Sequence, residues 1–305
     1  MRVLLAVAEH GGIAAAARAL SFTPPAVSQQ IAALERQLDV ELIDRSQRMA
    51  RLTLAGHRLA GHARQVLAGL EAAEADLASL DGPIHGVLRI GTIPTLGRTL
   101  LPATLAHLGA SAPELDLRIE QIESEESLPA LARGELDVAM AGEYDLTPGR
   151  RHTSVERLNL FTEPVFVAVP ANYPLPGPHV RLEDLRDARW IAPAPGTSCA
   201  VLLERSCAIA GYEPGVVGHC ADFALAADIV AAGHGIALIP SIAAPTNDSP
   251  SVRLLTAEDP SIHRTLYAAI RHGTRRHPAT ASLIEALTVA AKHFTAGGPA
   301  AEHAI

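Results

Sequence analysis

A chain of 305 residues is too long for one ordinary domain, so two or three domains are expected. Apolar residues make up 48% of the chain and charged residues 19%, which excludes a wholly disordered protein. A formal net charge of −8 disfavours nucleic acid as a partner unless the basic residues are concentrated in one segment.

The cysteine count and the hydropathy of the sequence indicate the cellular compartment. Cys199, Cys207 and Cys220 are too few, and odd in number, for a disulfide framework. No run approaches the roughly 20 apolar residues of a membrane span, and the residues after Met1 do not resemble a secretory signal. We therefore expect a cytoplasmic protein with no membrane partner.

The first 38 residues predict the three helices of a helix-turn-helix. Apolar spacing indicates helices over 2–10, 13–20 and 23–38. Thr23 suits a helix cap, and the two prolines after it fall in the first turn, where a missing N–H costs nothing. Polar side chains follow at the start of the third helix, a pattern typical of either a solvated face or a recognition helix.

A basic segment comes next, because residues 45–64 hold five arginines and no acidic residue. Residues 42–53 predict two short extended pieces around a bend, which indicates a wing lying along a DNA backbone. Arg48 and Arg51 are the wing residues expected to reach phosphate or the minor groove, although a charged surface turn also explains them. Residues 54–80 then predict a long helix whose apolar stripe needs a partner helix or its own chain.

From residue 83 onward, strand and helix patterns alternate in βαβ order. Strands are expected over 87–93, 115–122, 136–142, 164–170, 189–194, 215–219, 235–241 and 264–271. Helices are expected over 98–111, 127–135, 200–211, 222–233 and 278–294. This predicts an α/β fold with two lobes and a cleft: lobe I over about 86–161 and 265–295, lobe II over about 162–264, and a flexible tail over 296–305.

Taken in order, these segments resemble the LysR-type transcriptional regulators over roughly residues 1–295. The stretch VAEHGGIAAAARALSFTPPAVSQQIAALERQLDVELIDR, followed by LTLAGH, is similar to the N-terminal signature of that family. LRIGTIPT, GELDVAMAG and IVAAGHGIALIPS resemble phrases of its effector-binding half. The chain departs from the family pattern at two places. The segment ahead of the first helix is shorter, and Pro24 stands where the family often has a glutamine that contacts DNA.

The resemblance implies a winged helix-turn-helix over 1–56, a linker and dimerisation helix over 57–82, and an effector-binding domain over 83–305 that is type 2 periplasmic-binding-protein-like. It implies a regulator that binds an interrupted inverted repeat in double-stranded promoter DNA, as a homodimer through 57–80 and as a homotetramer. RNA polymerase is a further candidate partner, and activation and repression both stay open.

The residues expected to bind DNA lie at the start of the third helix and in the wing: Thr23, Pro25, Ala26, Ser28, Gln29, Gln30, Arg48 and Arg51. Glutamine can pair with adenine, and Pro25 can contact a thymine methyl group.

By the same resemblance, a small-molecule effector lies between the lobes, against strand ends and helix N-termini. The residues expected to hold it are Pro94, Thr95, Arg98, Thr99, Ser124, Thr197 and Ser198. Hydroxyls and free N–H groups at helix N-termini suit a carboxylate or another anion. Helix capping is the competing explanation for each hydroxyl.

Several alternatives stay open. Peroxide-sensing members of the family use two cysteines near Cys199 and Cys207, but positions eight apart in one helix are about 12 Å apart, and a disulfide needs less than about 7 Å. A regulator whose sensor domain binds no ligand is a second alternative. A two-lobed solute-binding protein would explain residues 86–295, but it should carry a signal peptide and no winged helix. No metal-binding or catalytic motif is present, so we expect no enzyme and no cofactor besides the effector.

Overall fold

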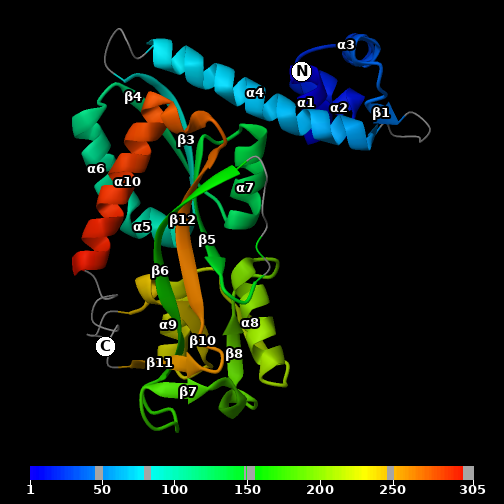
Figure 1. Ribbon diagram of the computed structural model, residues 1–305. Coiled ribbons are helices and arrows are strands. Elements are labelled where there is room, and N and C mark those ends of the chain that lie inside the picture. Colours follow the sequence, from blue (N-terminus) through cyan, green and yellow to red (C-terminus); the bar gives the residue numbers. More distant parts are fainter. Residues whose placement is uncertain (45–50, 79–83, 148, 150–154, 246–250, 298–305) are drawn as a thin grey trace. The chain divides into compact units, whose positions relative to one another are not determined.

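The computed structural model describes residues 1–44, 51–78, 84–147, 149, 155–245 and 251–297 (Figure 1). The chain forms two compact units, each described by itself below. Unit 1 comprises residues 1–82, 152–156 and 271–278, and unit 2 comprises 83–151, 157–270 and 279–305. The domain boundaries expected from the sequence stay predictions.

Unit 1 contains the expected helix-turn-helix and the helix that follows it. Its elements are α1 (Arg2–His10), α2 (Ile13–Ala19), α3 (Pro24–Leu38), β1 (Ile43–Asp44), β2 (Arg51–Leu52), α4 (Leu54–Ala78) and the 3₁₀ turn η4 (Thr274–Arg276). Gly11 ends α1 in the left-handed conformation, with φ of 73°. Apolar side chains of α1, α2, α3 and the first turns of α4 form its core. The end of the predicted helix, 79–80, lies outside the described residues.

Unit 2 is an α/β structure with two lobes. The lobe I elements are β3 (Gly86–Thr92), α5 (Pro94–Thr99), α6 (Leu101–Ser111), β4 (Leu115–Gln121), α7 (Ser124–Arg133), β5 (Val138–Tyr144) and α10 (Pro278–Gly297). The lobe II elements are β7 (His179–Arg181), η2 (Leu182–Leu185), β8 (Arg189–Ala192), α8 (Ser198–Ile209), β9 (Gly215–His219), α9 (Phe223–Ala231), β10 (Ala237–Pro240), η3 (Ser241–Ala243) and β11 (Val252–Glu258).

Two long strands, β6 (Val155–Pro170) and β12 (His263–Arg271), connect the lobes (Figure 1). In the main sheet the strand order is β4-β3-β5-β12-β6-β11-β7, with β10 also paired to β6, and β8 and β9 form a separate two-stranded sheet. β3 is parallel to β4 and β5, whereas β12 is antiparallel to β5, and β10 and β11 are antiparallel to β6. Each lobe has its own apolar core, and Tyr144 of β5, in lobe I, also packs into the core of lobe II.

Three expectations about elements were wrong in detail. The helix expected over 98–111 is two helices, because Pro94 starts α5 and Pro102, which has no backbone N–H, lies in the first turn of α6. The helix expected from residue 127 begins at Ser124, where Glu125 and Glu126 interact favourably with the positive end of the helix dipole. The strand expected from residue 164 begins at Val155. The first half of this strand is only partly buried, and because it has no continuous apolar run, the sequence pattern does not indicate it.

Candidate functional site

The start of α3 presents the side chains that the sequence predicts for base contacts. Thr23 caps the helix, since its Oγ1 accepts a hydrogen bond from the N–H of Ala26 at 3.4 Å. Val27 and Ile31 are buried in the core of unit 1. The other predicted residues lie off this buried face, with Ala26 and Ser28 half-buried and Pro25, Gln29 and Gln30 exposed.

Two side-chain contacts fix the base of the wing. The Glu35 carboxylate of α3 accepts hydrogen bonds from the N–H groups of Leu42 at 2.8 Å and Ile43 at 3.1 Å. The Thr53 hydroxyl accepts a hydrogen bond from the N–H of Gly56 at 3.0 Å, in the first turn of α4. The position of β1 relative to α3 and α4 is therefore set by local hydrogen bonds.

Of the two arginines predicted for the wing, one lies within the described residues. Arg51 is exposed on β2, opposite Asp44 of β1. Arg48 lies outside the described residues.

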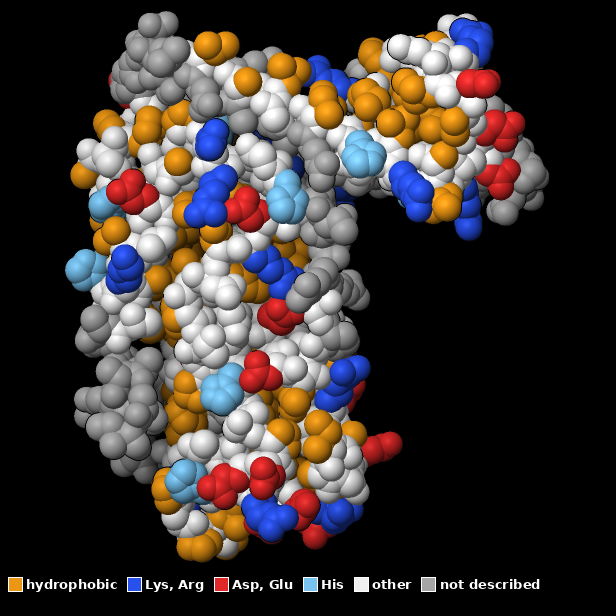
Figure 2. Space-filling model, in the orientation of Figure 1, with side chains coloured by type: hydrophobic (Ala, Val, Ile, Leu, Met, Phe, Trp, Pro, Cys, Tyr) orange, Lys and Arg blue, Asp and Glu red, His pale blue; other side chains and the backbone are white. Residues whose placement is uncertain are grey.

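The helix α4 changes its environment along its length. Leu59, Ala60 and Ala63 pack into the core of unit 1. Further along, Val66, Leu70 and Leu77 are exposed to 63%, 48% and 66%. On the face that Figure 2 shows, hydrophobic side chains lie over α4.

The predicted effector residues meet at the cleft between the lobes of unit 2. A cavity of about 110 Å³ is lined by Pro94, Thr95, Ser124, Thr197 and Ser198, among others. A second cavity of about 410 Å³ is lined by Pro94, Thr95, Arg98 and Thr99, together with the first turn of α9 and residues 242–245. The two cavities share the side chains of Pro94, Thr95, Ala221 and Phe223, so they adjoin each other.

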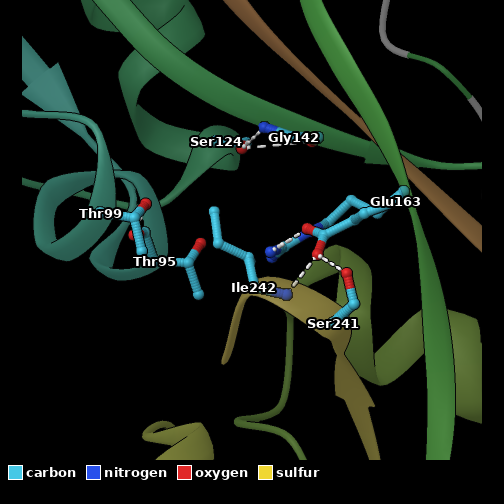
Figure 3. Close-up of polar contacts among 8 residues, drawn as sticks. Thr95, Thr99, Ser124, Gly142, Glu163, Ser241 and Ile242 are labelled. Atoms are coloured by element: carbon cyan, nitrogen blue, oxygen red, sulfur yellow. Dashed lines mark hydrogen bonds and ion pairs between the residues drawn. The ribbon is translucent and has the colours of Figure 1, made fainter. Parts of the chain in front are cut away.

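Most of the predicted hydroxyls already have partners within the protein. Thr197 caps α8, because its Oγ1 accepts from the N–H of Ala200 at 3.3 Å and donates to the carbonyl of Ala194 at 2.8 Å. Ser124 exchanges hydrogen bonds with the backbone of Gly142 at 3.1 and 3.3 Å (Figure 3).

The two threonines of α5 differ in the hydrogen bonding of their hydroxyl groups. The Thr99 hydroxyl donates to the carbonyl of Thr95 at 2.8 Å. The Thr95 hydroxyl is buried and has no hydrogen-bond partner among the described residues. Thr95 is therefore the predicted hydroxyl that keeps its bonding capacity for a ligand.

The anion expected at the N-terminus of α8 is supplied by the chain itself. The Glu125 carboxylate of α7 accepts from the N–H of Ser198 at 2.6 Å and also from the Ser198 hydroxyl. A ligand carboxylate at Ser198 would have to displace Glu125. No local sequence pattern marks Glu125 as the partner of Ser198, because 73 residues separate them.

A buried ion pair contributes one member, Arg264, to the lining of the first cavity, and the predicted effector residues do not include it. Arg264 of β12 donates from Nε at 2.8 Å and from Nη2 at 2.6 Å to Glu163 of β6, and their side chains are 3% and 0% exposed. The other Glu163 oxygen accepts from the Ser241 hydroxyl at 2.9 Å and the Ile242 N–H at 2.6 Å (Figure 3). Because 101 residues separate the partners, no local pattern in the sequence marks them.

Glu123 is a third carboxylate at the cleft, in a loop expected there but outside the predicted effector residues. Burial, followed by repulsion from Glu125, raises the pKa of its carboxyl group above the usual range. At the mouth of the second cavity, Arg98 lies 3.7 Å from Asp222 and is 70% exposed.

The cysteines lie in environments that suppress thiolate formation. Cys199 is buried beside Tyr144, and burial raises the pKa of its thiol to about 11. Cys207 is buried in the lobe II core, and burial raises the pKa of its thiol as well. Cys220 is half-exposed and contacts the carbonyl of Asp222.

Among the described residues, no group of three or more His, Cys, Asp or Glu side chains is placed to hold a metal ion. No helix in the described part of the chain is long and apolar enough to cross a membrane.

The comparisons with known proteins agree with the geometry of both units. Residues 1–57 match the family model of the bacterial regulatory helix-turn-helix protein, lysR family, and residues 81–292 match the LysR substrate binding domain.

Individual relatives are transcription regulators rather than enzymes. The chain is 32% identical over 281 residues to the "Probable hydrogen peroxide-inducible genes activator" of Streptomyces viridosporus, covering 90% of this chain and 88% of that protein. It is 28% identical to the HTH-type transcriptional regulator AlsR of Bacillus subtilis, over 80% of each. A hydrogen-peroxide-bound OxyR variant of Corynebacterium glutamicum superposes with a TM-score of 0.59 at 26% identity, covering 100% of this chain and 96% of that one. The chain belongs to the LysR family of transcriptional regulators.

Proposed function

We propose that this LysR-type regulator binds an interrupted inverted repeat in promoter DNA, in the cytoplasm, and that a small molecule in the cleft between its lobes modulates that contact. The observation that carries the effector proposal is the pair of adjoining cavities at which all seven predicted effector residues meet. Closure of two lobes around a ligand is a common way to change the geometry of an attached domain.

For DNA recognition, we propose the exposed start of α3 and the wing. The buried residues Val27 and Ile31 hold α3 in the core, which leaves Gln29 and Gln30 exposed for base edges. Thr23, Pro25, Ala26 and Ser28 would line the same end of the helix, with Arg48 and Arg51 on phosphate or in the minor groove.

For assembly, we propose a homodimer through residues 57–80 and, by resemblance to the family, a homotetramer. The support is the exposed apolar stripe of Val66, Leu70 and Leu77, which lies on one face of α4 at helical spacing. Such a stripe on a helix favours a partner helix over water.

The test is fluorescence anisotropy of the full chain on DNA from upstream of its own gene, with competitor DNA at two salt concentrations. We expect Gln29→Ala to weaken specific binding by about 1–3 kcal/mol, because a bidentate base contact is lost. The matched control is Gln37→Ala, an exposed glutamine near the other end of the same helix, which should leave the affinity unchanged. Equal effects of the two variants would contradict recognition by the start of α3.

Peroxide sensing is a second candidate function, because several relatives are named as hydrogen peroxide-inducible activators. The burial of Cys199 and Cys207 and the raised pKa values of their thiols oppose it, since the thiolate is the reactive form. We therefore expect hydrogen peroxide to leave DNA affinity unchanged in the anisotropy assay. A peroxide effect that Cys207→Ser abolishes would establish the redox function instead.

A further inference from the structure

The two adjoining cavities of the cleft have an excess of negative side chains. Their walls contain four carboxylates and two guanidinium groups, those of Glu123, Glu125, Asp222, Asp228, Arg98 and Arg264. The buried guanidinium group, that of Arg264, donates two hydrogen bonds to Glu163, whereas Arg98 is 70% exposed and lies 3.7 Å from Asp222. An anionic ligand would therefore enter a cleft whose buried cation already has a counter-charge.

The position best suited to an anion is also taken. In α8 the first-turn N–H and hydroxyl of Ser198 both donate to Glu125. A second carboxylate there would face repulsion from Glu125 and from Glu123, on the same cavity wall.

Glu123 is the carboxylate with unused bonding capacity. It lines the first cavity, and no described group donates a hydrogen bond to its side chain. Partial burial of an ionised group without a hydrogen-bond donor is unfavourable. The charge of Arg264 offsets only part of that cost, since burial still raises the pKa of Glu123, and a positively charged group within about 4 Å would offset more of it.

Thr95 gives an independent indication of a ligand at the same place. Its side chain is 7% exposed, its hydroxyl has no partner among the described residues, and it lies on the wall that both cavities share. Buried polar groups without a partner are few in native proteins. A polar ligand group between Thr95 and Glu123 would satisfy both side chains.

We propose that the cleft binds a small organic cation, an amine or amidine, with Glu123 as its counter-charge and Thr95 as a hydrogen-bond partner. The ring of Phe223, which lines both cavities, adds a surface that favours a cation. The inference rests on the proposed function, in that it names the chemical class of the effector for the same cleft.

The experiment is isothermal titration calorimetry of the full chain with three probes of the same shape and different charge: benzamidine, benzamide and benzoate. We expect benzamidine to bind at least about tenfold more tightly than benzamide, which corresponds to about 1.4 kcal/mol in binding free energy. Benzoate should give no heat of binding up to roughly 10 mM. Glu123→Gln should weaken benzamidine about tenfold and leave benzamide unchanged.

The matched control is Glu126→Gln, which removes one negative charge from the exposed part of the same first turn, outside both cavities. It should leave the benzamidine affinity at the wild-type value. Thr95→Val should weaken benzamidine and benzamide by the same factor, because both lose one hydrogen bond.

Three results would overturn the proposal: no benzamidine binding, tighter binding of benzoate, or equal effects of Glu123→Gln and Glu126→Gln. Tight binding of benzoate would leave the cleft as the effector site and reverse only the charge of the ligand. Since the titration contains no DNA, a failure of promoter binding is seen separately in the anisotropy assay.

Discussion

The carboxylate of Glu125 and the first-turn backbone N–H of Ser198 form a 2.6 Å hydrogen bond that joins lobe I to lobe II. The Ser198 hydroxyl donates to the same oxygen. A carboxylate at a helix N-terminus is stabilised by the free N–H groups and by the helix dipole. The chain therefore fills with its own side chain the anion position that the sequence predicts for an effector.

Removal of this carboxylate should create an anion site. In Glu125→Ala the N-terminus of α8 loses its acceptor, so we expect sulfate to stabilise this variant more than wild type. The measurement is Tm at about 50 mM sodium sulfate against sodium chloride of equal ionic strength, with an extra rise of about 2–4 °C in the variant for each 1 kcal/mol of binding.

Sulfate also stabilises most proteins by exclusion from their surface, so the control is Glu126→Ala, which lies in the same first turn of α7, is exposed and does not line the first cavity. An equal sulfate effect in Glu125→Ala, Glu126→Ala and wild type would show that no anion site had been opened.

A second prediction concerns the pH dependence of stability at Glu123. Burial, followed by repulsion from Glu125, raises the pKa of its carboxyl in the folded state. The folded chain then binds this proton more tightly than the unfolded chain, so the associated stability is present below the ordinary carboxyl pKa and is lost as the pH rises through the raised value. Glu123→Gln keeps the neutral form at every pH, and we expect its Tm to exceed that of wild type at neutral pH.

The advantage should shrink as the pH falls toward about 4, the ordinary pKa of a glutamate side chain, where both proteins are neutral at this position. Thermal unfolding across that range measures it. A difference in Tm that is constant with pH would mean that packing, rather than ionisation, distinguishes the two proteins.

The sequence predicts those parts of the fold that depend on local patterns. Apolar periodicity and proline placement indicate α1, α3 and the alternating elements of unit 2, and the strand-end loops indicate where the cleft lies. Long-range pairs give no such pattern: Glu163 and Arg264 compensate each other across 101 residues, and Glu125 contacts Ser198 across 73. The charge of the cleft depends on these pairs, whereas the expectation of an anionic effector rests on helix N-termini and on Arg98, which the local sequence shows.

A third prediction concerns the close contact between Gly56 of α4 and the backbone of Leu42 in unit 1. A Cβ on Gly56 would overlap the carbonyl oxygen of Leu42 and lie 3.1 Å from Cδ2 of Leu52, at the base of the wing. Gly56→Ala must therefore shift the backbone, and we expect a loss of about 1–3 kcal/mol in unfolding free energy, together with weaker DNA binding. The measurements are urea unfolding and fluorescence anisotropy.

Gly61 is the matched position for this change, because it lies on the same helix and an added Cβ there meets no described atom within 4 Å. Gly61→Ala should be neutral or stabilising by up to about 1 kcal/mol, since alanine favours the helix. Similar losses in the two variants would rule out the contact with Leu42 as the cause.

The last prediction concerns the buried pair of Glu163 and Arg264, which joins β6 to β12 where these strands pass between the lobes. Glu163→Gln leaves the Arg264 guanidinium buried without its counter-charge, and we expect urea unfolding to show a loss of about 3–5 kcal/mol. The pair of Arg275 and Glu156, whose side chains are 59% and 26% exposed, is the control, and Glu156→Gln should cost less than about 1 kcal/mol because water reaches the pair and screens it. If the pair acts as a unit, Glu163→Gln combined with Arg264→Met should lose less than the sum of the single losses, since no unpaired charge remains. Simple additivity would mean that each side chain stabilises the strands through separate contacts.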